Sequence, residues 1–384
     1  MLKILILSSL LSLYTYANNS SLINSPDKTP NKLHAEAWAP PVYGEQKALG
    51  YDAYSFATPK NLEAEVNFWV QIYTKYTSEQ GLFHLAGQSD KILGELDMTA
   101  IYRNPKWGPI RKELEAEKFA KREQKKLAAK LKIKNYKNVR FQRGLADRMR
   151  EAIVVSGQYL PMMEKIFRDE NIPIELTRLV FVESSFNVEA KSRVGASGLW
   201  QIMPIIGRKF KYLQTSFDKR DHPYYATKLA AKILKQNYQI LKNWSLSVTS
   251  YNYGVGSMLK AKRKLGTDDV EVIFGGKKEN PYIGFASRNF YATFLAALHV
   301  ESHANIYFGE PFLQKKPIEL KNVYLDNEIK LKDLLATHKL TRSDFVLMNP
   351  HIKDKYLQLS RKLPKGTLIT LPNKNKLATD QADD

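Results

Sequence analysis

The fold is decided by residues 183–204, which read ESSFNVEAKSRVGASGLWQIMP. A helix with apolar Leu176, Leu179, Val180 and Val182 is expected to end at Glu183. Gly195 and Gly198 then allow a tight turn, after which another helix is expected from near Leu199. A glutamate at the end of an apolar helix stands at the edge of a core, where desolvation penalises an ionised carboxyl. The pattern predicts a protonated glutamate that could serve as a general acid.

Other side chains of this stretch have the chemistry to contact a large substrate. Ser192 and Gln201 offer neutral hydrogen-bonding groups, and Trp200 and Met203 offer flat or soft apolar surface for sugar rings. From these residues alone, the alternative for Glu183 is an ordinary solvated or capping residue at a helix end.

The stretch resembles the signature of lytic transglycosylases of the soluble-transglycosylase type, which act on peptidoglycan and have a goose-lysozyme-like helical fold. The matching positions are Glu183, Ser184, Ser192, Gly195, Ala196, Gly198, Leu199, Gln201, Met203 and Pro204. A second block of that family, Tyr-Asn-x-Gly, appears at residues 251–254, and residues 288–290 are similar to a third. Residues 68–76 and 142–161 resemble the membrane-bound lytic transglycosylase D branch, so the resemblance extends from about residue 60 to 372.

Two positions depart from the family pattern in the third block. Where the family carries Glu and, four positions later, Tyr, this chain has Ala286 and Phe290. The missing carboxylate and hydroxyl put substrate preference and rate in question more than the type of reaction.

The resemblance implies a mechanism with one catalytic carboxyl. Glu183 would protonate the oxygen joining N-acetylmuramic acid to N-acetylglucosamine, then take a proton from the muramyl C6 hydroxyl as a 1,6-anhydro ring closes. The residues implied to bind substrate, with Tyr251 also hydrogen-bonding Glu183, are Ser192, Gln201, Met203, Tyr251, Asn252 and Phe290. No cofactor is expected. Two alternatives stay open: a hydrolytic muramidase using the same Glu183, and a non-catalytic peptidoglycan-binding scaffold.

The charge of the chain favours a polyanionic partner. The 384 residues include 59 Lys or Arg and 39 Asp or Glu, a net charge of +20. Charge alone does not separate nucleic acid, an anionic membrane surface and an acidic wall polymer. The export of the protein, predicted below, argues against nucleic acid.

Export is predicted from residues 1–17. A basic start at Lys3, an apolar run over 4–13 and a small residue at Ala17 have the layout of a secretory signal peptide, and the apolar run is too short to span a bilayer. The chain has no cysteine, so neither disulfides nor a lipid-bearing cysteine are expected. We therefore predict an exported protein of the bacterial periplasm or cell envelope, with no transmembrane anchor after signal cleavage.

The predicted fold class is mainly α. We expect a linker over 18–48, a small N-terminal α/β region over 49–140, a lysozyme-like helical domain over 141–312, a βααβ module over 319–373 that resembles a LysM domain, and a disordered tail over 374–384. The expected helices cover 61–76, the basic segment 111–140, parts of an amphipathic pattern over 142–170, then 175–183, 224–241, 245–253, 258–265, 288–300, 330–337 and 342–348. The expected strands cover 81–86, 92–98, 321–325 and 367–371.

One further pattern concerns metals. His299 and His303 stand at i and i+4 on an expected helix, a spacing that metal sites use. A third ligand is not evident, so the sequence predicts no metal site.

Overall fold

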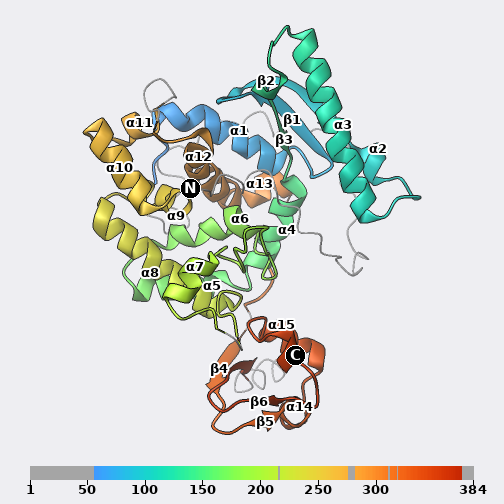
Figure 1. The fold of residues 1–384 in the computed structure, drawn as a ribbon, viewed down its shortest axis with the longest axis vertical. Coiled ribbons are helices and arrows are strands. Elements are labelled where there is room, and N and C mark those ends of the chain that lie inside the picture. Colours follow the sequence, from blue (N-terminus) through green and yellow to red (C-terminus); the bar gives the residue numbers. More distant parts are fainter. Residues whose placement is uncertain (1–55, 215–216, 276–281, 310–311, 318, 374–384) are drawn as a thin grey trace.

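The computed structural model describes residues 56–214, 217–275, 282–309, 312–317 and 319–373, and over this range the protein is mainly helical (Figure 1). The expected signal peptide, linker and C-terminal tail lie outside the described residues. Within them, no helix combines the length and apolar character needed to cross a membrane.

A small sheet forms the N-terminal part of the structure. Strands β1 (Gln80–Leu85), β2 (Gln88–Asp97) and β3 (Val139–Arg143) pair antiparallel in the order β2-β1-β3, and helix α3 (Pro109–Lys130) packs against this sheet. The predicted hairpin is confirmed. The basic helix ends at Lys130 rather than near residue 140, because the following chain turns back to pair with β1, and such non-local pairing leaves little trace in local composition.

The central core is helical. Its helices are α1 (Glu63–Thr74), α4 (Ala146–Ser156), α5 (Leu160–Asp169), α6 (Leu179–Ser184), α7 (Pro204–Lys209), α8 (Pro223–Leu241), α9 (Trp244–Tyr253), α10 (Val255–Leu265), α11 (Val270–Ile273), α12 (Phe285–Ser302) and α13 (Ala304–Phe308). Helices α1, α6 and α9 all pack against α12, which is buried from Ser287 to Val300. Helix α1 thus shares a core with helices beyond residue 140.

Two predicted helical segments are interrupted. The amphipathic pattern over 142–170 becomes strand β3 followed by α4 and α5, with Gly157 ending α4. The helix expected from near Leu199 begins at Pro204 instead, and Ser197 and Ile202 pair across a tight turn before it. Proline suits the first helical position because the amide it lacks has no partner there in any case.

The C-terminal module, residues 319–373, has its own small core of Leu331, Phe345, Leu363 and Ile369, among others. Strand β4 (Leu320–Tyr324) pairs antiparallel with β7 (Leu368–Pro372), and α14 (Leu331–His338) and α15 (Arg342–Met348) lie between them in the chain. This confirms the predicted strand-helix-helix-strand order. A short additional pair, β5 (Ile329–Lys330) with β6 (Lys362–Leu363), was not predicted.

The C-terminal module contacts the central domain at the start of α8 (Figure 1). The Nε2 atom of His222 lies 2.8 Å from Oγ1 of Thr370, and the amide of Asp218 donates to the carbonyl of His351 at 2.9 Å. The His222 and His351 rings are 4.6 Å apart. Burial lowers the pKa of His351 to about 4, so the contact is made between uncharged rings at neutral pH.

Candidate active site

Glu183 lies at the C-terminal end of α6 and is only 4 % exposed. The helix is short, and its other side chains, including Leu179, Val180 and Phe181, enter the central core. A buried ion-pair network supports the preceding turn, where Arg178 contacts Glu164 at 2.5 Å and Glu301 at 3.1 Å. The structure therefore places Glu183 in the core at the end of α6, and ion pairs of Arg178 hold the turn before it.

The backbone is strained directly after Glu183. Ser185 and Phe186 both adopt left-handed conformations, with φ of 51° and 57°. Each such non-glycine residue costs about 1 kcal/mol or more. Phe186 compensates because its ring is buried and packs edge-on against Phe181 at 4.7 Å. The chain is thus forced to leave the helix sharply at the carboxyl-bearing turn.

Gln201 holds the loop that follows. Its Nε2 atom donates to the carbonyls of Ala190 at 3.0 Å and Gly198 at 2.9 Å, and its own φ is 43°. A side chain at position 198 would meet the carbonyl of Arg220 at 2.2 Å, so only glycine fits there. The amide nitrogen of Gln201 is therefore engaged within the protein, and a role of this residue in binding substrate stays a prediction.

Arg220 is the central support of this loop, and our sequence reasoning missed it. Its Nη1 atom donates to the carbonyls of Gly195 and Ile202, both at 2.8 Å, and its guanidinium pairs with Asp218 at 2.7 Å. Both residues are buried. The only sequence signal was an Asp-x-Arg-Asp run just before a proline that starts a helix, which gives no indication of what the arginine reaches.

Asp221 ties the same loop to the start of α8. Its carboxylate accepts a hydrogen bond from Ser197 Oγ and lies 3.8 Å from Lys191 Nζ. Burial raises the pKa of Asp221 to about 6, although the hydrogen bond from Ser197 opposes this. The loop from 190 to 202 is thus fixed by two neighbouring charged residues just before α8, Arg220 and Asp221.

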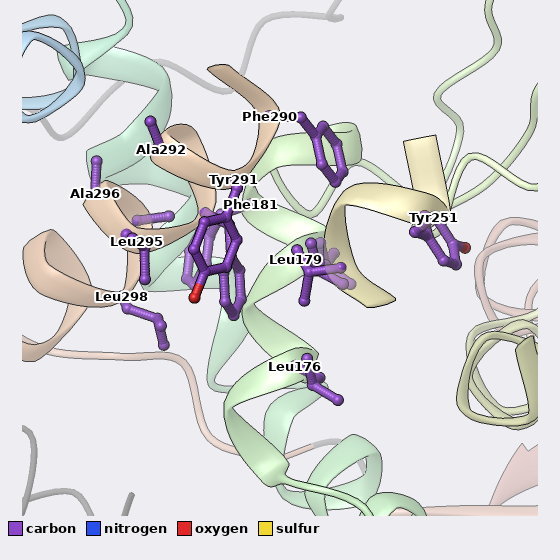
Figure 2. Close-up of a cluster of buried hydrophobic side chains, with 14 of the residues drawn as sticks. Leu176, Leu179, Phe181, Tyr251, Phe290, Tyr291, Ala292, Leu295, Ala296 and Leu298 are labelled. Carbon is purple, nitrogen blue, oxygen red and sulfur yellow. The ribbon is translucent and has the colours of Figure 1, made fainter. Parts of the chain in front are cut away.

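Tyr251 on α9 lies near Glu183. Burial raises the pKa of its phenol, and the negative charge of Glu183 adds to this. The hydroxyl donates to the carbonyl of Trp200 at 2.9 Å. Figure 2 shows Tyr251 on α9, Leu176 and Leu179 on the segment that leads to Glu183, and Phe290 on α12.

The remaining predicted substrate-binding residues differ in exposure. Asn252 and Phe290 are 9 % and 4 % exposed, and Phe290 belongs to the central core. Ser192 is half-buried, and its Oγ accepts from the amide of Ala196 at 2.9 Å. Met203 is half-buried at the start of α7. Substrate contact by these four residues stays a prediction.

One expectation is wrong. Trp200 does not offer a face to sugar rings, because its side chain is fully buried. Its ring stacks on Phe167 at 5.6 Å, and its Nε1 atom donates to Thr227 at 2.9 Å. The indole is a core residue with its one polar atom satisfied, which sequence spacing could not distinguish from a residue that lines a site.

This geometry lies within one recognisable family region. Residues 162–274 match the transglycosylase SLT domain. The region runs from α5 to α11 and contains Glu183, the loop to Ile202, Arg220 and Tyr251.

Two curated relatives each match about a quarter of this chain in sequence. Membrane-bound lytic murein transglycosylase D of Escherichia coli (strain K12) is 36 % identical over 96 residues, 24 % of this chain and 21 % of that protein. An Alteromonas protein named for tributyltin chloride resistance is 33 % identical over 93 residues, 24 % of this chain and 45 % of that protein. The chain thus spans about a fifth of the lytic transglycosylase and under half of the second relative.

Among solved structures, the 70 kDa soluble lytic transglycosylase of Escherichia coli is similar to 41 % of this chain and 26 % of its own, with 23 % sequence identity and a TM-score of 0.32.

No metal centre accompanies the SLT region in the described residues, where no group of three or more His, Asp or Glu side chains could hold an ion. The rings of His299 and His303 are 4.4 Å apart, and the Nε2 atom of His299 lies 2.9 Å from the Tyr307 hydroxyl. Burial lowers the pKa of His299 to about 4.

Proposed function

We propose that this protein is a peptidoglycan lytic transglycosylase in which Glu183 is both the acid and the base. The observation that carries this proposal is the buried position of Glu183 at the end of α6, inside a region that matches the transglycosylase SLT domain. A match to lytic murein transglycosylase D supports the same substrate.

The proposed reaction balances with one carboxyl group. Protonated Glu183 gives its proton to the glycosidic oxygen, and the bond from that oxygen to the muramyl anomeric carbon breaks. The muramyl acetamido group stabilises the positive charge at that carbon. The C6 hydroxyl oxygen then bonds to the same carbon, Glu183 takes its proton, and a 1,6-anhydro end results without consumption of water.

The surroundings of Glu183 suit this cycle. A buried carboxyl retains its proton more readily than an exposed one, as an acid of this kind requires. The Tyr251 phenol lies within the electrostatic influence of Glu183. Its proton goes to the Trp200 carbonyl, so its oxygen would orient protonated Glu183 by accepting a hydrogen bond from it. Gln201 and Arg220 hold the loop that follows Glu183 in place before substrate binds.

Product analysis of Glu183→Gln tests the proposal. Purified peptidoglycan is digested with the wild-type chain, with Glu183→Gln and with Glu189→Gln, an exposed glutamate six residues away that serves as the control. We expect wild type and the control to release anhydro-muropeptides. Glu183→Gln lacks the catalytic acid, so its turnover should be at least about a hundredfold lower than that of the wild-type chain.

Mass spectrometry of the same products separates the two alternatives. A hydrolytic muramidase would give reducing-end products heavier by one water than the anhydro form. A non-catalytic scaffold would bind peptidoglycan without releasing fragments, in wild type and Glu183→Gln alike. Unchanged turnover by Glu183→Gln would remove this residue from the mechanism.

We further propose that the chain acts outside the cytoplasm, in the periplasm or cell envelope, after export directed by residues 1–17. The C-terminal module would add a LysM-like contact to N-acetylglucosamine units, and its strand-helix-helix-strand order supports this. Mass spectrometry of the N-terminus of the exported protein tests the first point. We expect the exported protein to lack residues 1–17.

A further inference from the structure

Aromatic rings from three separate segments meet where the C-terminal module contacts the central domain. Tyr225, near the start of α8, has its ring centre 5.1 Å from that of Tyr224 and 6.4 Å from that of Tyr212. Its hydroxyl lies 3.2 Å from that of Tyr324 on β4. The first three rings are half-buried, and Tyr324 is 54 % exposed. A partly exposed aromatic surface therefore crosses from one body to the other.

Lysine ammonium groups border these rings. Lys219 lies 4.8 Å from the ring centre of Tyr225, Lys228 lies 5.5 Å from that of Tyr224, and Lys232 lies 5.1 Å from that of Phe210. Within the part of the chain that the structure describes, none of the three forms an ion pair with a carboxylate. The rings hold the ammonium groups in place while leaving their charge uncompensated.

Acidic residues are nearly absent from the surrounding sequence. Between Glu189 and Asp268 the only two are Asp218 and Asp221, and both are buried and engaged by Arg220, Ser197 or Lys191. The surface composed of Phe210, Tyr212, Tyr224, Tyr225, Tyr324, Lys219, Lys228 and Lys232, here the junction surface, therefore carries three lysines that no ion pair within the described residues neutralises.

We propose that the junction surface binds a peptidoglycan strand at a place other than the bond that is cut. The tyrosine rings would contact sugar rings, and Lys219, Lys228 and Lys232 would pair with carboxylates of the peptides attached to the strand. The proposal rests on the function proposed above. None of these residues belongs to the loop from Glu183 to Ile202, so the strand would be gripped by both bodies outside that loop.

Two observations favour a carboxylate-bearing glycan over an anionic membrane. The rings of Tyr212, Tyr224 and Tyr225 are half-buried, whereas membrane insertion needs protruding apolar side chains. Phenol hydroxyls such as the Tyr225–Tyr324 pair can also hydrogen-bond sugar hydroxyls.

Sedimentation with insoluble peptidoglycan tests the proposal in the full chain carrying Glu183→Gln, so that the strands stay intact. The test variant combines Lys219→Gln, Lys228→Gln and Lys232→Gln, and a second variant is Tyr324→Ala. The matched control removes the same charge from exposed lysines of α3: Lys121→Gln, Lys125→Gln and Lys130→Gln.

We expect the junction variant to bind about tenfold more weakly and the α3 control less than about twofold. Tyr324→Ala should weaken binding with an unchanged salt dependence. Equal losses in the junction variant and the control would overturn the proposal in favour of general charge attraction. Unchanged binding would also overturn it. The same variants are also tested for binding to vesicles containing phosphatidylglycerol. A loss of binding seen only with these vesicles would overturn the proposal and identify a membrane surface instead.

Turnover separates this proposal from the proposed reaction. With Glu183 restored, the junction variant should digest peptidoglycan with a raised KM and an unchanged kcat, because the proton transfers are untouched. If the wild-type chain releases no anhydro product, the proposed reaction fails, while the sedimentation comparison between the junction variant and the α3 control still decides the binding site.

Discussion

Arg220 donates from Nη1 to the carbonyl oxygen of Gly195 at 2.8 Å. The same atom also reaches Ile202, so one buried guanidinium joins both ends of the turn that contains Gln201. Asp218 neutralises its charge, and the amide of Asp218 in turn donates to His351 of the C-terminal module. The loop that follows Glu183 and the module contact are therefore linked through Asp218 and Arg220, in the segment that leads into α8.

Replacing this guanidinium should damage both stability and turnover. Arg220→Ala leaves the carboxylate of Asp218 buried without its partner and should lower the free energy of unfolding by about 3–5 kcal/mol. The double variant Asp218→Asn with Arg220→Gln removes both charges and should regain part of that stability in urea unfolding. It should not regain turnover, because glutamine cannot bridge both carbonyls. Full recovery of both properties would show that the bridge has no positioning role.

Tyr251→Phe removes the hydroxyl that bonds the Trp200 carbonyl. The buried carbonyl loses its donor, so stability should fall by about 1–2 kcal/mol, and peptidoglycan turnover should fall at least about tenfold if this phenol orients Glu183. Tyr253→Phe is the matched control, since that hydroxyl bonds the carbonyl of Tyr282. Similar turnover in the two variants would exclude a special role for Tyr251.

Asp221→Asn should stabilise the protein at neutral pH. The folded pKa of Asp221 is about 6, above the value near 3.9 expected when unfolded, so its stabilising contribution is complete below about pH 4 and is lost as pH rises through 6. Asparagine can still accept from Ser197 without charge. Urea unfolding at pH 7 should show a gain of up to roughly 3 kcal/mol, offset slightly by the lost Lys191 contact. A gain of the same size at pH 4 would contradict this account.

His351→Gln should weaken the acid sensitivity of the protein. The folded pKa of His351 is about 4, below the value near 6.5 expected when unfolded, so its contribution to stability is present above pH 6.5 and is lost as pH falls through 4. Glutamine can keep the donor to the Leu368 carbonyl, 3.0 Å away, and does not titrate.

The measurement compares unfolding free energies at pH 6.5 and pH 4 in an Asp221→Asn background, because Asp221 titrates there with the opposite sign. Between pH 6.5 and pH 4, the free energy of unfolding of the His351→Gln variant should fall by up to roughly 3 kcal/mol less than that of its parent. The pKa of His222 is also lowered, chiefly by burial, so some acid sensitivity should remain. Identical pH profiles would mean that His351 carries none of it.

The sequence by itself determined the local features of this protein. Helices such as α8 and α9, the β1–β2 hairpin and the order of elements in the C-terminal module follow from periodicity, turn residues and proline, which act between residues close in the chain. The fixed spacing of residues 183–204 likewise located Glu183 at the edge of a core, where the structure places it.

Tertiary structure decided what these residues touch. Trp200 lies inside the core rather than facing a sugar, Arg220 reaches back to Gly195 and Ile202, and β3 pairs with β1 across more than fifty residues. The meeting of Tyr225 with Tyr324 is likewise visible only in the folded chain. Hydrogen bonds and burial between distant segments depend on how whole elements pack, and no local sequence pattern encodes that packing.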